Sequence, residues 1–187
     1  MSIRQLLLVP FLGMLLLASA MAQPSLRSGL PPGQRPGPYS ALVSTGPQRG
    51  QAHCFICETE DRPAVIVFAR NLSDPLGKLA HQLDKALAEH KPAELRGWIT
   101  FLAEDHTSLD KKVVAWAQQH AVSVLPLAVF EDVVGPPSYR LARDADVTVL
   151  LSVKQKVVAN FAFRAGELND ARMAEVMKAL PQITAKQ

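Results

Sequence analysis

The chain has 187 residues, and its 20 Lys and Arg against 17 Asp and Glu give a formal net charge of +3. That charge is small and scattered along the chain, which argues against a nucleic-acid-binding surface. The two cysteines are too few for a disulfide scaffold. A chain of this length buries enough apolar surface to fold without such cross-links. We therefore expect the cysteine pair to have a local role.

The first 22 residues have the three parts of a secretory signal. Arg4 supplies a positive charge, residues 6–17 are predominantly apolar, and Ala20-Met21-Ala22 is an A-x-A cleavage site. The apolar part is shorter than a membrane span requires. We expect cleavage near Ala22, a secreted or periplasmic protein in an oxidising compartment, and no stable membrane insertion after cleavage. The alternative is an uncleaved N-terminal anchor.

Residues 23–51 are rich in Pro and Gly, most densely over residues 29–38. Such a composition favours extended, unpacked backbone and lacks the apolar periodicity of a helix or strand. We predict a flexible linker over residues 23–51 and a single folded domain over residues 52–187. Within the linker, residues 39–44 fit a short leading strand.

The domain begins with a strand pattern followed by a helix pattern. Residues 64–68 form a continuous apolar run rich in β-branched side chains, as expected of a strand buried on both faces. Ser73 or Asp74 caps the next helix, with Pro75 at its first position. Apolar residues then recur at helical spacing until Lys91-Pro92: Leu76, Leu79, Ala80, Leu83 and Leu87.

The later elements follow from the same patterns. Further strands are predicted at residues 97–102, 122–130, 147–153 and 157–163, and further helices at residues 110–121 and from Asn169 or Asp170 to Pro181. Lys154-Gln155-Lys156 is short enough to join the last two strands as a hairpin. The order β-α-β-α-β requires right-handed crossovers and a mainly parallel sheet. The hairpin adds an antiparallel edge to that sheet.

Three segments in this order resemble the thioredoxin-like superfamily, in particular its redoxin and peroxiredoxin-like branch. They are residues 67–76, residues 122–126 and the hairpin over residues 147–161, and the resemblance covers residues 52–183. It implies an α/β, thioredoxin-like three-layer sandwich. The expected sheet is mainly parallel, with an antiparallel C-terminal hairpin and flanking helices.

The chain departs from this family at the catalytic turn. The family carries Cys-x-x-Cys at the start of its first helix, where this chain has Ser73-Asp74-Pro75-Leu76. These residues cannot cycle as a dithiol, and we expect no peroxidase activity of the usual redoxin type. Pro126 takes the place of the family's cis-proline in a thioredoxin-type alignment. A redoxin-type alignment puts Asp146-Val147 there instead and leaves Pro126 as an edge proline.

Cys54 and Cys57 are the candidate catalytic residues, as a redox pair. In an extended strand, Cα atoms three residues apart are separated by roughly 10 Å, beyond the roughly 7 Å limit for a disulfide. A turn would bring them within reach, and the adjacent His53 could supply a positive neighbour. We hypothesise that they form a reversible disulfide. The alternative is a structural clip that closes the turn before the first strand.

Metal binding is the other chemistry open to this segment. The available soft ligands are His53, Cys54 and Cys57, with a fourth from His81, His106 or His120. No second His or Cys lies at a spacing diagnostic of a metal site. The histidine also precedes the cysteine pair, whereas c-type haem attachment needs a histidine after it. We therefore expect no metal and no cofactor.

Two functional classes follow. In the first, the chain is a thiol–disulfide oxidoreductase or redox-responsive protein that uses Cys54 and Cys57, with protein thiols or disulfides as partners. In the second, it is a redox-inactive binding or scaffold module. Strand polarity favours the second class, because the cysteines precede the first strand and Ser73 follows it. The two places would lie at least roughly 15 Å apart unless the cysteine segment folds back along the sheet.

Overall fold

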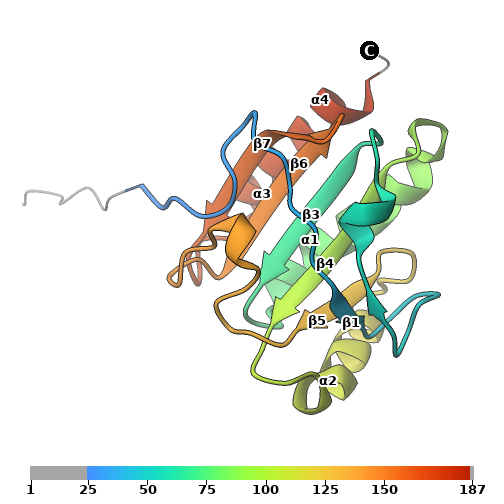
Figure 1. The fold of residues 1–187 in the computed structure, drawn as a ribbon, viewed down its shortest axis with the longest axis vertical. Coiled ribbons are helices and arrows are strands. Elements are labelled where there is room, and N and C mark those ends of the chain that lie inside the picture. The colour runs from blue at the N-terminus through green and yellow to red at the C-terminus, as the bar shows by residue number, and fades with distance from the viewer. Residues whose placement is uncertain (1–24, 186–187) are drawn as a thin grey trace, which may run out of the picture.

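The computed structural model describes residues 25–185, which form a seven-stranded mixed sheet with helices packed on it (Figure 1). The sheet order is β2-β1-β5-β4-β3-β6-β7. The strands are β1 (Ala41–Val43), β2 (Ala52–His53), β3 (Ala64–Ala69), β4 (Arg96–Leu102), β5 (Leu127–Phe130), β6 (Val147–Val153) and β7 (Lys156–Phe163). The helices are α1 (Asp74–Glu89), α2 (His106–Gln119), α3 (Asp170–Ala179) and α4 (Pro181–Thr184), with 3-10 turns η1 (Phe55–Glu58), η2 (Lys91–Ala93) and η3 (Pro137–Tyr139). The expected signal sequence over residues 1–22 lies outside the described residues.

The pairing of the strands confirms the predicted α/β thioredoxin-like fold. β3 pairs in parallel with β4, and β4 pairs in parallel with β5. β6 pairs antiparallel with β3, and β7 antiparallel with β6, which gives the expected C-terminal hairpin. The strand predicted at residues 122–130 begins only at Leu127, because the preceding N–H groups bond to a helix side chain and not to a neighbouring strand.

Side-chain caps fix where the helices begin. Ser73 caps α1 and Asn169 caps α3, as predicted, and each side-chain oxygen accepts a main-chain N–H three residues further on. α2 begins at His106, earlier than predicted, because Asp105 accepts from the Ser108 N–H at 2.8 Å. None of the helices in the described part of the chain is both long enough and apolar enough to cross a membrane.

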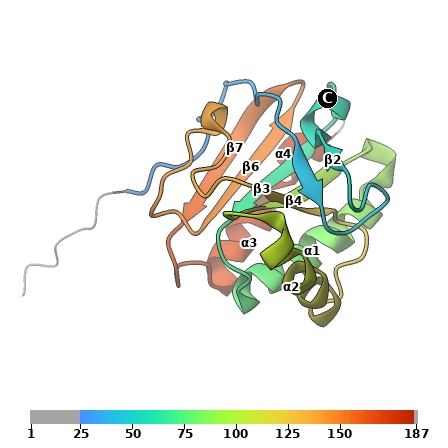
Figure 2. The ribbon, with the colours of Figure 1, turned by 60° about the horizontal axis from the view of Figure 1, so that its bottom comes forward.

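The three longest helices pack on one face of the sheet, as the two ribbon views show (Figures 1 and 2). Alternate strand residues meet the helices on this face: Val65, Val67, Ile99, Phe101, Leu127, Val129, Val147, Val149 and Leu151. On the opposite face, the described residues provide no α-helix, and the segment before β1, η1, η3 and their flanking loops cover the sheet. The third layer of the sandwich is therefore built from irregular segments.

Residues 25–40 are part of this irregular layer, although the Pro and Gly content of residues 23–51 predicted a flexible linker. Leu30 and Tyr39 are buried in the apolar cluster of the sheet face. Asn160 Nδ2 of β7 donates to the carbonyl O atoms of Ser28 and Leu30. Because a side chain of the sheet donates hydrogen bonds to the carbonyl groups of this extended backbone, the segment stays in place without pairing as a strand. The linker prediction does not hold for these residues, and the domain begins before residue 52.

The connection between β5 and β6 completes the irregular layer. Arg70, which follows β3 directly, donates through its guanidinium to the carbonyl O atoms of Val133, Ala142 and Ala145. A single side chain thereby fixes both ends of the connection. Tyr139, in the middle of it, is fully buried against the sheet.

Asp84 on α1 anchors the loop before β5. Its side chain is buried, and Oδ1 accepts from the N–H groups of Ser123, Val124 and Leu125 at 2.9, 2.7 and 2.7 Å. We expect Asp84→Ala to lower the free energy of unfolding by about 3 kcal/mol, because it leaves several donors without an acceptor. Urea unfolding would measure the change. Asp84→Asn keeps one acceptor oxygen and should lose less; a loss below about 1 kcal/mol in Asp84→Ala would contradict the anchor.

Candidate redox site

The two cysteines lie at a one-turn helix between β2 and β3. Cys54 precedes η1 and Cys57 lies within it, and the Cys57 N–H donates to the Cys54 carbonyl O at 3.1 Å. The turn brings the two Cα atoms to 5.4 Å, and the cysteines form a disulfide. The turn that a disulfide at this spacing requires is therefore present.

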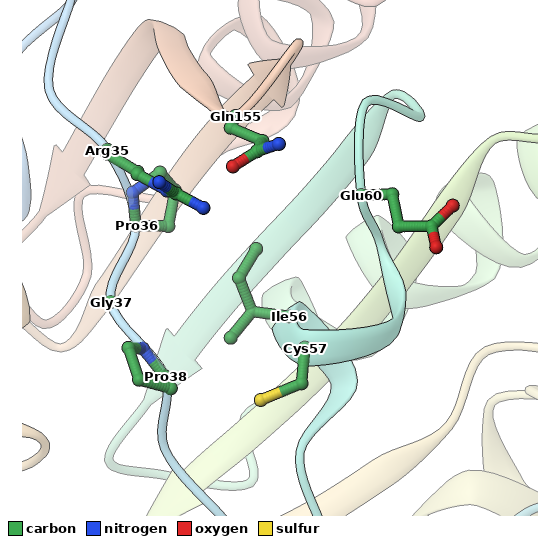
Figure 3. Close-up of a pocket in the computed structure, with 8 residues that line it drawn as sticks. All are labelled: Arg35, Pro36, Gly37, Pro38, Ile56, Cys57, Glu60 and Gln155. Carbon is green, nitrogen blue, oxygen red and sulfur yellow. The ribbon is translucent and has the colours of Figure 1, made fainter.

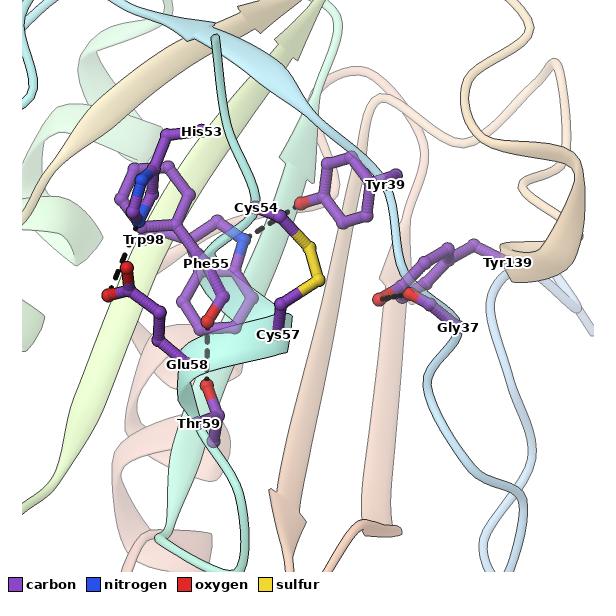
Figure 4. The surroundings of a disulfide bond; sticks show 10 residues. All are labelled: Gly37, Tyr39, His53, Cys54, Phe55, Cys57, Glu58, Thr59, Trp98 and Tyr139. Carbon is purple, nitrogen blue, oxygen red and sulfur yellow. Dashed lines mark hydrogen bonds and ion pairs between the residues drawn. A yellow bond between two sulfur atoms is a disulfide. The ribbon is translucent and has the colours of Figure 1, made fainter. Parts of the chain in front are cut away.

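Aromatic stacking holds this turn against the sheet (Figure 4). Phe55 stacks on Trp98 of β4 with ring centroids 5.5 Å apart. His53 packs edge-on against Phe55 at 4.6 Å, and its Nε2 lies 3.5 Å from a carboxylate oxygen of Glu58. Thr59 Oγ1 donates to the Phe55 carbonyl O. His53, the expected positive neighbour, thus faces Phe55 and Glu58 and not the sulfur atoms (Figure 4).

Two buried tyrosines lie beside the disulfide turn (Figure 4). The Tyr39 hydroxyl accepts from Trp98 Nε1 and shares a hydrogen bond with the Thr100 hydroxyl, both at 2.8 Å. The Tyr139 hydroxyl donates to the Gly37 carbonyl O at 2.9 Å, and its ring packs edge-on against Tyr39. Burial raises the pKa of both phenols well above the ordinary tyrosine value. The two rings thus fix the N-terminal segment to the sheet as neutral groups.

A pocket of about 540 Å³ opens beside Cys57 (Figure 3). Its lining comes from the N-terminal segment, the cysteine turn and the β6–β7 turn: Arg35, Pro36, Gly37, Pro38, Ile56, Cys57, Glu60 and Gln155. The Cys57 sulfur points across the pocket toward Pro38 (Figure 3). Cys57 is exposed, whereas Cys54 is half-buried. Of the two cysteines, Cys57 is therefore the more open to solvent.

The sequence patterns single out neither the wall of this pocket at residues 35–38 nor the two tyrosines. The pocket wall and the two tyrosines belong to segments without helical or strand periodicity. One signal was available: Tyr39 and Tyr139 are the only tyrosines of the chain, and each closely follows a pair of prolines. Proline restricts the backbone to extended conformations, which suits a segment that lies along a sheet with one aromatic anchor.

The cysteine turn folds back along the sheet, on the face opposite α1. Phe55 and Ile56 pack against the apolar cluster of that face. Trp98, on which Phe55 stacks, pairs with Ile66 in the interior of β3. The disulfide therefore lies neither at the tip of α1 nor at the far end of the sheet, and the sheet separates it from Ser73.

The turn at the start of α1 is packed against α2. Trp116 Nε1 donates to the Ser73 carbonyl O at 3.3 Å, and His120 Nε2 lies 3.4 Å from Asp74 Oδ1. A Cβ on Gly77 would clash with the ring of His120, so the residue that ends α2 leaves no room at this position. Ser73 is a helix cap, as its place in the sequence predicts.

Pro126 lies before β5 in a trans peptide, since the described residues contain no cis peptide bond. Because β3, β4 and β5 are parallel, Pro126 lies at the N-terminal end of β5, level with the interior of β3 and away from the turn that follows β3. Asp146 lies beside that turn, where its carbonyl O accepts from the Arg70 N–H at 3.0 Å and its carboxylate accepts from Asn71 Nδ2 at 2.6 Å. The redoxin-type alignment is therefore the appropriate one, and Pro126 does not occupy the cis-proline position.

No group of three or more His, Cys, Asp or Glu within residues 25–185 is arranged to hold a metal ion. The histidines considered as a fourth ligand, His81, His106 and His120, belong to α1, to α2 and to the end of α2. These helices cover the face of the sheet opposite the disulfide. The structure therefore does not bring the histidines to the cysteines.

No family model and no curated protein matches the chain. Solved structures do match. A Bacteroides thetaiotaomicron protein provisionally assigned as a protein disulfide isomerase has a TM-score of 0.64 and 15% identity over 86% of this chain and 96% of its own. Peroxidoxin BcpB from Mycobacterium tuberculosis has a TM-score of 0.59 and 15% identity over 81% of this chain and 97% of its own. A thiol-disulfide oxidoreductase from Bacteroides fragilis has a TM-score of 0.55 and 12% identity over 79% of this chain and 99% of its own. At these identities the likeness confirms the thioredoxin-like fold alone.

Proposed function

We propose that this protein carries out thiol–disulfide exchange through Cys54 and Cys57, in a secreted or periplasmic compartment. The observation that carries the proposal is the difference between the two cysteines: Cys57 is exposed on a pocket, and Cys54 is half-buried in the same turn. An exchange pair needs one sulfur that a partner can reach and a second that stays near to displace it. The thiol-disulfide oxidoreductase among the structures of similar fold agrees with this assignment.

The exchange proceeds in two displacements. In the reduced protein, the Cys57 thiolate attacks one sulfur of a partner's disulfide, a mixed disulfide forms, and the partner's other sulfur leaves as a thiolate. The Cys54 thiolate then attacks the Cys57 sulfur, the Cys54–Cys57 bond forms, and the partner's second thiolate leaves. Two electrons pass from the cysteine pair to the partner, and the two protons of the cysteine thiols end on the partner's thiols. A partner dithiol drives the same steps in reverse.

The pocket beside Cys57 indicates the shape of the partner. Pro36, Pro38 and Ile56 give it apolar sides, and the side chains of Arg35, Glu60 and Gln155 supply its polar groups. It lies between the N-terminal segment and the cysteine turn (Figure 3). An extended polypeptide segment that carries a cysteine fits this open groove better than an enclosed small molecule.

An insulin-reduction assay with dithiothreitol tests the proposed function. We expect the protein to accelerate insulin precipitation, and the variant Cys54→Ser/Cys57→Ser to show only the background rate. Ser73→Asp is a matched control, because it alters the turn where the family carries its cysteines and keeps a capping side chain. This control should retain the activity. Equal rates for the protein and the double variant would refute exchange.

A second candidate function has one observation in its favour. Both residues between the cysteines, Phe55 and Ile56, pack against the aromatic face of the sheet. A disulfide around such a turn can serve as a clip that holds a redox-inactive binding module in shape. In that case the bond would resist millimolar dithiothreitol under native conditions. In the exchange protein it would be reduced rapidly, and free-thiol titration distinguishes the two.

A further inference from the structure

A second cavity lies against the cysteine turn, and Cys57 does not line it. Its volume is about 310 Å³, at the lower end of the range of small-molecule sites. Its apolar walls are formed by Phe55 and Trp98, by Leu87 of α1, and by Leu95 and Pro126. Since Phe55 belongs to the cysteine turn, the turn divides this cavity from the pocket beside Cys57.

The lining of this second cavity carries a net positive charge. Lys91 and Arg96 line it, both residues are exposed, and neither forms an ion pair with another described residue. The lining contains one carboxylate, Glu58, and that group is engaged with His53 at 3.5 Å. An apolar interior with two available cations at its mouth is complementary to an apolar anion.

We propose that this cavity binds a small apolar monocarboxylate, such as an arylalkanoate. The apolar group of the ligand lies against the stacked rings of Phe55 and Trp98, where its burial supplies the affinity. Its carboxylate lies at the rim with Lys91 and Arg96, and the guanidinium offers two parallel donors that match a carboxylate. The small volume of the cavity selects a free small molecule over a longer acyl chain or a folded partner.

The loop that forms one side of this cavity is rigidly placed. Val124 and Pro126 line the cavity, and the N–H groups of Ser123, Val124 and Leu125 are held by Asp84. A wall fixed in this way is preformed, which lowers the cost of binding. The cavity is present with the disulfide closed, so binding by the oxidised protein needs no cysteine chemistry. This proposal is therefore independent of the proposed exchange function.

Calorimetric titration of the oxidised protein with 4-phenylbutyrate tests the proposal. We expect saturable binding at one site, and binding weaker by about fivefold for the uncharged amide of the same acid. Lys91→Glu/Arg96→Glu should weaken the binding of the acid by about tenfold and leave that of the amide unchanged. Absence of saturable binding, or equal affinities for the acid and the amide, would overturn the proposal.

A matched pair of surface variants locates the site. Val124 is 52% exposed at the rim of the cavity, and Val134 is 42% exposed elsewhere. Val124→Trp should fill the mouth and weaken binding by at least about tenfold, since the ligand loses its apolar contacts. Val134→Trp adds the same ring away from the cavity and should bind like the unaltered protein. Equal affinities for both variants would place the ligand elsewhere and overturn the assignment.

Discussion

Cys54→Ser is expected to accumulate a stable mixed disulfide through Cys57, whereas Cys57→Ser is expected to form little. The reason is exposure: Cys57 is exposed beside the pocket, and Cys54 is half-buried in the turn. Mixed-disulfide formation depends on access to the attacking sulfur. With oxidised glutathione, we expect Cys54→Ser to form the adduct at least about tenfold faster than Cys57→Ser. Intact-protein mass spectrometry over time gives both rates.

The comparison between the two single variants removes the main confounding effect. Both variants lose the same cross-link, so any loosening of η1 affects them equally. Cys54→Ser also lacks the resolving thiol, and its adduct should therefore persist until a reductant is added. Equal rates in the two variants would show that the exposure of Cys57 does not direct the exchange. Faster reaction in Cys57→Ser would reverse the roles assigned to the two cysteines.

The regular part of the fold could be predicted from the sequence because its signals are local. The apolar run that became β3 is buried on both faces, as its composition predicts. The cap at Ser73 and the apolar spacing that follows it define α1. The short turn between β6 and β7 closes the predicted hairpin. In each case the residues that determine the element lie within the element or next to it.

The irregular layer could not be predicted, because its determinants are distant in the chain. Nothing near Leu30 or Tyr39 indicates that Asn160 and Trp98 will bind that segment. A Pro-rich stretch has the same local pattern whether it is solvated or lies on a sheet. Likewise, residues 122–126 are apolar enough for a strand, but Asp84 accepts the N–H groups of Ser123, Val124 and Leu125.

The disulfide of the candidate site could be predicted from the sequence, but its location in the fold could not. The residue types and spacing of Cys54 and Cys57 predict the disulfide that the structure contains. The place of the turn depends on Phe55 meeting Trp98, a contact between distant segments that no local pattern reveals. The distance expected from strand polarity assumed a cysteine segment in line with β3. The cysteine segment instead folds back over the sheet face that carries no α-helix, so the expected distance does not apply.

The two tyrosines of the aromatic face on which the cysteine turn lies are expected to make the protein less stable at alkaline pH. Tyr39 and Tyr139 are the only tyrosines of the chain, and burial raises the pKa of both above the ordinary value. In the unfolded chain each phenol loses its proton at roughly pH 10. Below that pH their contribution to stability is fully present. Above it, the unfolded state releases protons that the folded state retains, and stability falls as pH rises.

We therefore expect no phenolate absorbance while the protein remains folded above roughly pH 10, and a decrease in unfolding free energy of about 3 kcal/mol per pH unit from the two tyrosines together. Absorbance and circular dichroism followed through one alkaline titration should change together. Tyr139→Phe leaves Tyr39 as the single tyrosine and should halve the slope to about 1.4 kcal/mol per pH unit. A phenolate signal that precedes the loss of ellipticity would show that the rings are accessible, and would contradict their role in holding the N-terminal segment to the sheet.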